Sequence, residues 1–138
     1  MIIYIDENMP EELAEGLNIL QKQLNKKYHT EIEVKSIKRV FGQGAKDEEW
    51  IPIAGDQGAC IITQDSKIQR IKHQSELCKK YKLGLFFLNQ PSGKGLTYWQ
   101  MVELCVQRWE SILEIALREE RPFCYRHTAR KGFTKLSL

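Results

Sequence analysis

The chain has 138 residues, of which 42% are hydrophobic and 28% are charged, which is typical of one folded domain that needs no disulfide or metal staple. The formal net charge is only +3, so the overall charge gives no indication of nucleic-acid binding. The sequence shows no signal-peptide pattern and no apolar run long enough to cross a bilayer. We therefore expect a single cytoplasmic domain over residues 1–138, with no membrane partner.

The cysteines indicate neither a disulfide framework nor a zinc site. Cys60, Cys78, Cys105 and Cys124 are widely spaced and form no CxxC or Cys/His pair. The three histidines also lack ligand spacing. We expect buried free thiols in a reducing compartment.

Strands and helices alternate from the first residues. The continuous apolar run IIYI (2–5) is typical of a central strand buried on both faces. Pro10 suits the first turn of a helix that reaches about Lys26. The alternating segment IEVKSI (32–37) predicts a second strand. The expected apolar face of the helix is Leu13, Leu17, Leu20 and Leu24.

The middle of the chain repeats this pattern. A glycine-containing loop (41–46) precedes a short helix (47–55) that Gly55 can end. ACIIT (59–63) predicts a third strand. The spacing of Ser66 and Gln69 is that of a capping box at the start of the next helix.

A further strand, a long helix and a hairpin complete the chain. GLFFLN (84–89) predicts the fourth strand, and QPSGKG (90–95) is a loop, not a Walker A motif, because Leu88 stands where that motif has its first glycine. Thr97 and Gln100 form a second capping-box candidate, before a helix that Pro122 cannot continue. The segments 123–128 and 132–136 predict a closing hairpin.

This order predicts an α/β fold, a three-layer α/β/α sandwich with a mostly parallel central sheet and a closing C-terminal β-hairpin. Such sheets bind ligands beyond the carboxyl ends of their strands. Asp6 and Asp65 follow the first and third strands, which we expect to be neighbours, and Asp47 opens the helix after the second strand. The three acids should therefore meet at one rim of the sheet.

Clustered carboxylates favour a hard cation such as Mg²⁺ or Mn²⁺. Taken alone, Asp6 or Asp47 is more typical of a helix cap, and their joint placement with Asp65 is what favours a site. Lys67 and Arg70 lie one turn apart directly after Asp65 and suit contacts with backbone phosphates, although a solvated helix face is the simpler interpretation.

We assign the remaining aromatic residues mainly to packing and the remaining basic residues mainly to the surface. We expect the side chains of Trp50, Trp99 and Trp109 to pack in the interior. Tyr125 and Phe133 are more typical of core or edge packing than of base stacking. Basic residues of the tail could contact a phosphate backbone, but an ordinary hairpin is the favoured interpretation; they are Arg126, Arg130, Lys131 and Lys135.

The layout IIYIDEN…KDEEWIPIAGDQGACIITQDSKIQR resembles PIN-like domains, in particular the compact bacterial lineage grouped with VapC-type toxins. In that lineage an N-terminal strand ends in Asp, a helix begins with a D-E-x-W-like stretch, and a strand ends in T-x-D before a basic helix. The similarity runs from Met1 to about Leu88.

The resemblance implies a metal-dependent endoribonuclease. Asp6, Asp47 and Asp65 match the family's acids, with Glu48 as a partner or substitute for Asp47, and Mg²⁺ or Mn²⁺ as the cofactor. The sequence offers no equivalent of the fourth acid of many PIN nucleases. The resemblance further implies an RNA substrate, a role as the toxin of a type II toxin–antitoxin system, and a cognate antitoxin that covers the acidic rim; a homodimer is left open.

Two alternatives remain. The missing fourth acid favours a catalytically inert PIN-like module that binds RNA or a protein. A phosphoryl-accepting receiver domain also places carboxylates after its first strand, and Asp65 could be its acceptor, but the lysine that such a domain requires is not identifiable.

Overall fold

A six-stranded sheet forms the centre of the protein. The computed structural model describes residues 1–64, 68–88 and 95–137. The strand order is β2-β1-β3-β4-β5-β6, and all neighbours are parallel except β6, which runs antiparallel to β5. The strands are β1 (Ile2–Ile5), β2 (Glu33–Ser36), β3 (Cys60–Thr63), β4 (Gly84–Leu88), β5 (Phe123–Thr128) and β6 (Gly132–Lys135).

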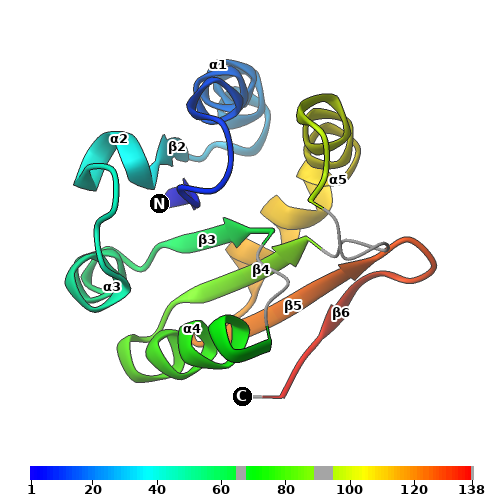
Figure 1. Ribbon diagram of the computed structural model, residues 1–138. Helices are drawn as coiled ribbons and strands as arrows, with labels where there is room; N and C mark the ends of the chain where they lie inside the picture. Colours follow the sequence, from blue (N-terminus) through cyan, green and yellow to red (C-terminus); the bar gives the residue numbers. More distant parts are fainter. Residues whose placement is uncertain (65–67, 89–94, 138) are drawn as a thin grey trace.

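Helices cover both faces of this sheet (Figure 1). The helices are α1 (Glu11–Tyr28), α2 (Ile37–Phe41), α3 (Asp47–Asp56), α4 (Ile68–Tyr81) and α5 (Tyr98–Arg118). α1 and α5 pack on one face, whereas α2, α3 and α4 pack on the other. The expected α/β/α sandwich with a mostly parallel sheet and a closing hairpin is confirmed.

The alternation of side chains along the strands explains the two cores. In β1, Ile3 and Ile5 face α1 and α5, while Tyr4 faces α2 and α3. In β4, Phe86 and Phe87 divide between the two faces in the same way. Successive side chains of a strand point to opposite faces, so a strand covered on both sides must be apolar throughout, as the segments 2–5 and 84–88 are.

The buried face of α1 differs from the expected one. Leu13, Ala14 and Leu17 are buried as the pattern requires, but Leu20 is 58% exposed and Gln21 is fully buried in its place. Gln21 faces inward because its Oε1 accepts a 2.7 Å hydrogen bond from the indole Nε1 of Trp109 on α5. A polar contact between helices therefore sets the rotation of α1.

The prediction for Trp99 was wrong, whereas those for Trp50 and Trp109 are confirmed. Trp50 is 2% and Trp109 is 5% exposed, but Trp99 is 71% exposed. Trp99 lies in the first turn of α5, where the Thr97–Gln100 capping box forms as expected. Its ring lies at a centroid distance of 5.3 Å from the ring of Tyr98.

Two element boundaries also differ from the sequence patterns. The second strand ends at Ser36, whose side chain accepts a hydrogen bond from Arg39 N and caps the short helix α2, which the pattern did not predict. Gly55 does not end α3, which continues to Asp56. A Cβ at position 55 would lie 2.4 Å from the backbone oxygen of Tyr81, so Gly55 permits the close approach of α3 to the end of α4.

Several expectations fall on residues that the structure does not describe. They are Asp65, the Ser66–Gln69 capping box, Lys67, the end of the fourth strand at Asn89, and most of the loop 90–95. No helix in the described residues is long and apolar enough to cross a bilayer.

The contact between Gln21 and Trp109 predicts that a Trp→Phe substitution changes the free energy of unfolding more at position 109 than at position 99. Trp109→Phe removes the donor and leaves the fully buried Gln21 Oε1 without it, which should lower the free energy of unfolding by about 1–3 kcal/mol. Trp99→Phe, at a side chain 71% exposed, should change it by no more than about 0.5 kcal/mol. Urea denaturation followed by circular dichroism measures both. Equal losses would contradict the role given to the Gln21–Trp109 hydrogen bond.

Candidate functional site

Asp6 lies directly after the carboxyl end of β1. Its backbone N–H donates to Ile62 O of β3 at 3.0 Å, which continues the parallel pairing one residue beyond the strand. The residue is 2% exposed. Its Oδ2 accepts a 2.8 Å hydrogen bond from the Thr63 hydroxyl, and its Oδ1 accepts one from the Glu7 backbone N–H at 3.0 Å. Both carboxylate oxygens are therefore held in fixed directions.

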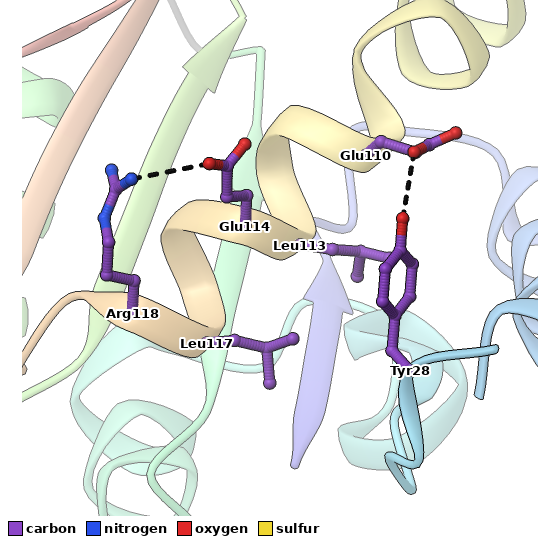
Figure 2. A pocket seen from close by; sticks show the side chains of 6 residues that line it. All are labelled: Tyr28, Glu110, Leu113, Glu114, Leu117 and Arg118. Carbon is purple, nitrogen blue, oxygen red and sulfur yellow. Dashed lines mark hydrogen bonds and ion pairs between the residues drawn. The ribbon is translucent and has the colours of Figure 1, made fainter. Parts of the chain in front are cut away.

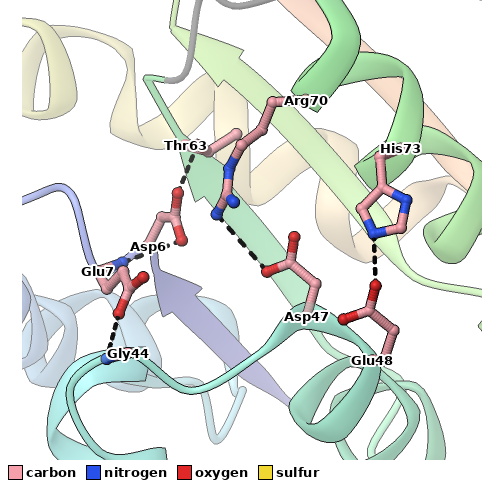
Figure 3. A network of polar contacts seen from close by, with 8 residues as sticks. All are labelled: Asp6, Glu7, Gly44, Asp47, Glu48, Thr63, Arg70 and His73. Carbon is pink, nitrogen blue, oxygen red and sulfur yellow. Dashed lines mark hydrogen bonds and ion pairs between the residues drawn. The ribbon is translucent and has the colours of Figure 1, made fainter.

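Asp47 approaches the same rim from a helix. It is the first residue of α3 and is 6% exposed. Its Oδ1 lies 3.7 Å from Arg70 Nη2, and Arg70 comes from α4. Figure 3 shows the Arg70 guanidinium extending into the space between the Asp6 and Asp47 side chains.

Two hydrogen bonds tie the surrounding loops to this rim. Glu7 Oε2 accepts from the backbone N–H of Gly44, in the loop that leads to Asp47 (Figure 3). Gln64 Nε2 donates to the backbone oxygen of Asn8 at 3.0 Å. The segment after β1 is thus fastened both to the loop before α3 and to the end of β3.

Burial dominates the electrostatics of Asp6. Loss of hydration raises the pKa of the Asp6 carboxyl above its ordinary value. The hydrogen bonds from Thr63 and Glu7 and the positive Arg70 lower this pKa, and the negative Asp47 raises it. Burial therefore makes ionisation of Asp6 less favourable, and a cation at the rim would offset this cost.

The structure brings together Asp6 and Asp47, two of the three predicted acids. It also gives Arg70 and Glu48 partners that the sequence did not indicate. Asp65 and Lys67 lie outside the described residues. Arg70 faces Asp47. Glu48 Oε1 lies 2.8 Å from His73 Nε2 of α4 (Figure 3). A hydrogen bond to its own backbone and then this bond to His73 lower the pKa of Glu48.

Thr63 and His73 are the side chains at this rim that sequence reasoning missed. Thr63 was treated only as part of the T-x-D stretch, yet its hydroxyl is buried against Asp6. The signal was available, because Thr63 is the polar end of the otherwise apolar strand CIIT. For His73 no local signal exists, since its partner Glu48 lies 25 residues away.

The residues at the rim fit a hard cation. Mg²⁺ takes oxygen ligands and is commonly held by one or two carboxylates, with water and substrate phosphate completing its shell. Each Asp6 oxygen accepts one hydrogen bond and keeps a further lone pair. The residues that the structure describes contain no group of three or more potential metal ligands, so the described donor set is the pair Asp6 and Asp47.

The thiols offer no competing soft-metal or nucleophilic site. All four cysteines are buried and free, as expected. Burial raises the pKa of Cys60 and Cys124 to about 11 and that of Cys105 to about 12, and it also raises the pKa of Cys78. The thiols therefore stay protonated at neutral pH.

A mostly parallel α/β sheet with two buried aspartates at its carboxyl rim is compatible with the nuclease-type fold expected from the sequence. The family model of the PIN-like domain matches residues 1–90, the part of the chain that contains β1 to β4 and both aspartates described above. The chain belongs to the PIN-like domain family. No curated protein and no solved structure matches it. Family membership favours the nuclease-type interpretation over the receiver-domain alternative.

The raised pKa of Asp6 predicts that its neutral analogue stabilises the metal-free protein. Because the pKa of Asp6 is raised in the folded protein, the folded state holds the carboxyl proton of Asp6 more tightly than the unfolded chain does. The free energy of unfolding therefore falls as the pH rises from the ordinary pKa of an aspartate through the pKa of Asp6 in the folded protein. Asp6→Asn should therefore raise Tm at pH 7 in EDTA, each 1 kcal/mol gained corresponding to about 3–5 °C at this size. The gain should disappear toward pH 4.

Thermal unfolding between pH 4 and pH 8 measures this difference. Asp56→Asn is the matched control, because Asp56 is exposed at the other end of α3, and it should leave Tm nearly unchanged across the range. A gain at Asp6→Asn that does not depend on pH would show that burial of its charge is not the cause.

Proposed function

We propose that this protein is a metal-dependent endoribonuclease that hydrolyses RNA phosphodiesters at the rim formed by Asp6 and Asp47. The observation that carries the proposal is a pair of buried carboxylates, Asp6 directly after β1 and Asp47 at the start of α3, at the carboxyl rim of a PIN-like sheet. Burying two carboxylates costs free energy, and cation binding is a function that offsets this cost.

In this proposal the metal ligands are Asp6, Asp47 and Asp65, with Glu48 as a further candidate. Bound Mg²⁺ or Mn²⁺ would supply a water nucleophile of lowered pKa and neutralise charge on the phosphate. Thr63 and the Glu7 backbone N–H hold the Asp6 carboxylate in a fixed orientation. Such preorganisation reduces the reorganisation needed when a cation and a phosphate arrive.

Arg70 has two roles in this proposal. In the metal-free protein its guanidinium, 3.7 Å from Asp47, partly neutralises the acid pair. When a metal ion takes over that neutralisation, Arg70 becomes available to a backbone phosphate of the RNA, together with Lys67. Arginine suits this exchange because its planar fork binds carboxylate and phosphate alike.

The proposal predicts metal-dependent cleavage that the acid pair controls. The wild-type protein should bind Mn²⁺ and cleave single-stranded RNA in Mg²⁺ or Mn²⁺, and EDTA should abolish cleavage. Asp6→Asn and Asp47→Asn should each weaken Mn²⁺ binding and cleavage by more than about 100-fold, since even indirect contacts to a metal are worth about 10–100-fold. Asp56→Asn should retain both.

Isothermal titration and a fluorescent RNA substrate provide the two measurements, and circular dichroism establishes that each variant is folded. If folded Asp6→Asn cleaved RNA like the wild type, the proposed site would be wrong. If the folded wild type bound RNA but not millimolar Mn²⁺, the inert PIN-like module would be the better description; the position of Arg70 beside Asp47 favours that alternative.

The two roles of Arg70 predict opposite effects on metal and RNA. Arg70→Gln removes a positive charge next to Asp47, so Mn²⁺ should bind more tightly. RNA should bind more weakly, and the slope of log K against log [salt] should decrease in magnitude by about 0.7, the value for one phosphate contact on a single strand. Lys79→Gln, an exposed position on the same helix, is the charge-matched control. A fall in both affinities would contradict the exchange.

The narrower role, that of the toxin in a type II toxin–antitoxin pair, rests on the resemblance to VapC-type toxins. Expression of the wild-type chain should then arrest growth, and expression of Asp6→Asn should not. A cognate antitoxin would relieve the arrest by covering the rim, with an Arg or Lys taking the place that Arg70 has beside Asp47.

A further inference from the structure

A second polar hollow lies away from the acid pair, between α5 and the β5–β6 hairpin. Its volume is about 310 Å³, and we call it the hairpin pocket. The pocket is lined by Arg108, Ser111, Glu114 and Arg118 of α5 and by Lys131 and Gly132 of the hairpin, with Ile115 and Phe133 as its apolar wall. None of these elements supplies a residue to the acid pair.

The hairpin pocket carries a net positive charge. Of its three cations, Arg118 is compensated, because its Nη1 lies 3.5 Å from Glu114 Oε1. Figure 2 shows this pair at an adjoining, less polar pocket, whose lining also includes Tyr28 and Glu110. Neither Arg108 nor Lys131 forms an ion pair with any residue that the structure describes.

Two buried nitrogen atoms, one in the pocket lining and one beside it, lack a hydrogen-bond partner among the described residues. One is Nε of Arg108, and the other is Nε2 of His127, a side chain that is 5% exposed. His127 pairs in register with Phe133 of the pocket wall, and their rings lie 5.3 Å apart. Buried polar atoms are nearly always hydrogen-bonded, so the unpaired Nε of Arg108 indicates a missing partner at the pocket that this residue lines. His127 does not line the pocket itself but lies next to its wall residue Phe133.

Burial and the neighbouring charge of Arg108 also determine the protonation state of His127. Both lower the pKa of His127, so its ring is neutral at neutral pH and carries one N–H. The alternation along β5 places His127 on the same face as Phe123 and Tyr125, which pack toward α5. The pocket thus combines uncompensated cations with neutral donors such as the Ser111 hydroxyl.

We propose that the hairpin pocket binds a phosphate group. A phosphate has the charge that Arg108 and Lys131 leave uncompensated, and its several acceptor oxygens match a guanidinium fork with additional donors. Glu114 opposes an anion, but Arg118 neutralises it at 3.5 Å. A backbone phosphate of RNA and a free phosphate or phosphorylated small molecule share this chemistry. The proposal does not depend on the nuclease activity.

Titration of the full chain with inorganic phosphate, at constant ionic strength and followed by NMR, tests this site. The backbone amides of Ser111, Lys131 and Gly132 and the ring of His127 should shift together along one saturable curve. A short single-stranded RNA oligonucleotide forms the second arm. Tighter binding of RNA than of phosphate would identify the RNA backbone as the source, and binding of phosphate alone would identify a small ligand.

Substitutions separate the pocket from the general charge of the hairpin. Lys131→Gln and Arg108→Gln should each weaken phosphate binding about tenfold, the loss expected for one hydrogen bond to a charged group. Lys131 is exposed, so its variant keeps the test valid if Arg108→Gln fails to fold. Arg130→Gln, in the same turn but outside the pocket, should bind within about twofold of the wild type.

Three results would overturn the proposal. The first is the absence of a saturable shift with either ligand. The second is unchanged binding in folded Lys131→Gln. The third is an equal loss of affinity in Arg130→Gln, which would assign the binding to the charge of the whole hairpin.

Discussion

The pairing of β1 with β3 at the centre of the sheet is the constraint on which the candidate site depends. The register that sets Ile5 opposite Ile62 continues into the bond from Asp6 N to Ile62 O. This bond brings the Asp6 carboxylate within 2.8 Å of the Thr63 hydroxyl. A slip of one residue would turn Asp6 to the opposite face of the sheet. The apolar strands that hold the core together therefore also fix the first carboxylate.

The second carboxylate depends on packing on one face of the sheet. Trp50, Ile51 and Ala54 of α3 are buried against the sheet with Ile37 and Tyr4, which fixes the helix that Asp47 begins. α4 packs beside α3 and supplies both Arg70 and His73. The face with α1 and α5 contributes no side chain to the acid pair. Its interhelical polar contact between Gln21 and Trp109 and its basic hairpin pocket form separate features.

The family match explains why local order and spacing identified so much of this arrangement. Strands covered on both sides are continuous apolar runs, and their order predicted the sheet, the hairpin and the meeting of Asp6 with Asp47. The sequence could not predict which polar residues turn inward. Gln21 is buried in place of Leu20 because it accepts a hydrogen bond from Trp109. The two residues are 88 positions apart, so no local pattern indicates this contact. Trp99 is 71% exposed although its hydrophobicity favoured burial.

Short elements escaped prediction for a related reason. α2 spans only Ile37–Phe41, and the alternation of the preceding strand continues into it, so the periodicity gave no boundary. Ser36 marks that boundary through its cap to Arg39, a signal that is weak without knowledge of the fold. The pairing of Glu48 with His73 and the burial of the Thr63 hydroxyl likewise arise from tertiary contacts that no single segment encodes.

The close approach at Gly55 links the packing at one end of α3 to the position of Asp47 at the other end. Gly55 meets Tyr81 at one end of the helix, while Asp47 lies at the other end, about 12 Å away at 1.5 Å per residue. A side chain at position 55 would push that end outward and tilt the helix, which would change the gap between Asp47 and Asp6. In the proposed metal site such a change would alter which cation fits, because Mg²⁺–oxygen distances are about 2.0–2.1 Å and Ca²⁺–oxygen distances are about 2.3–2.6 Å. A glycine remote from the rim would then influence the proposed site through the helix that Asp47 begins.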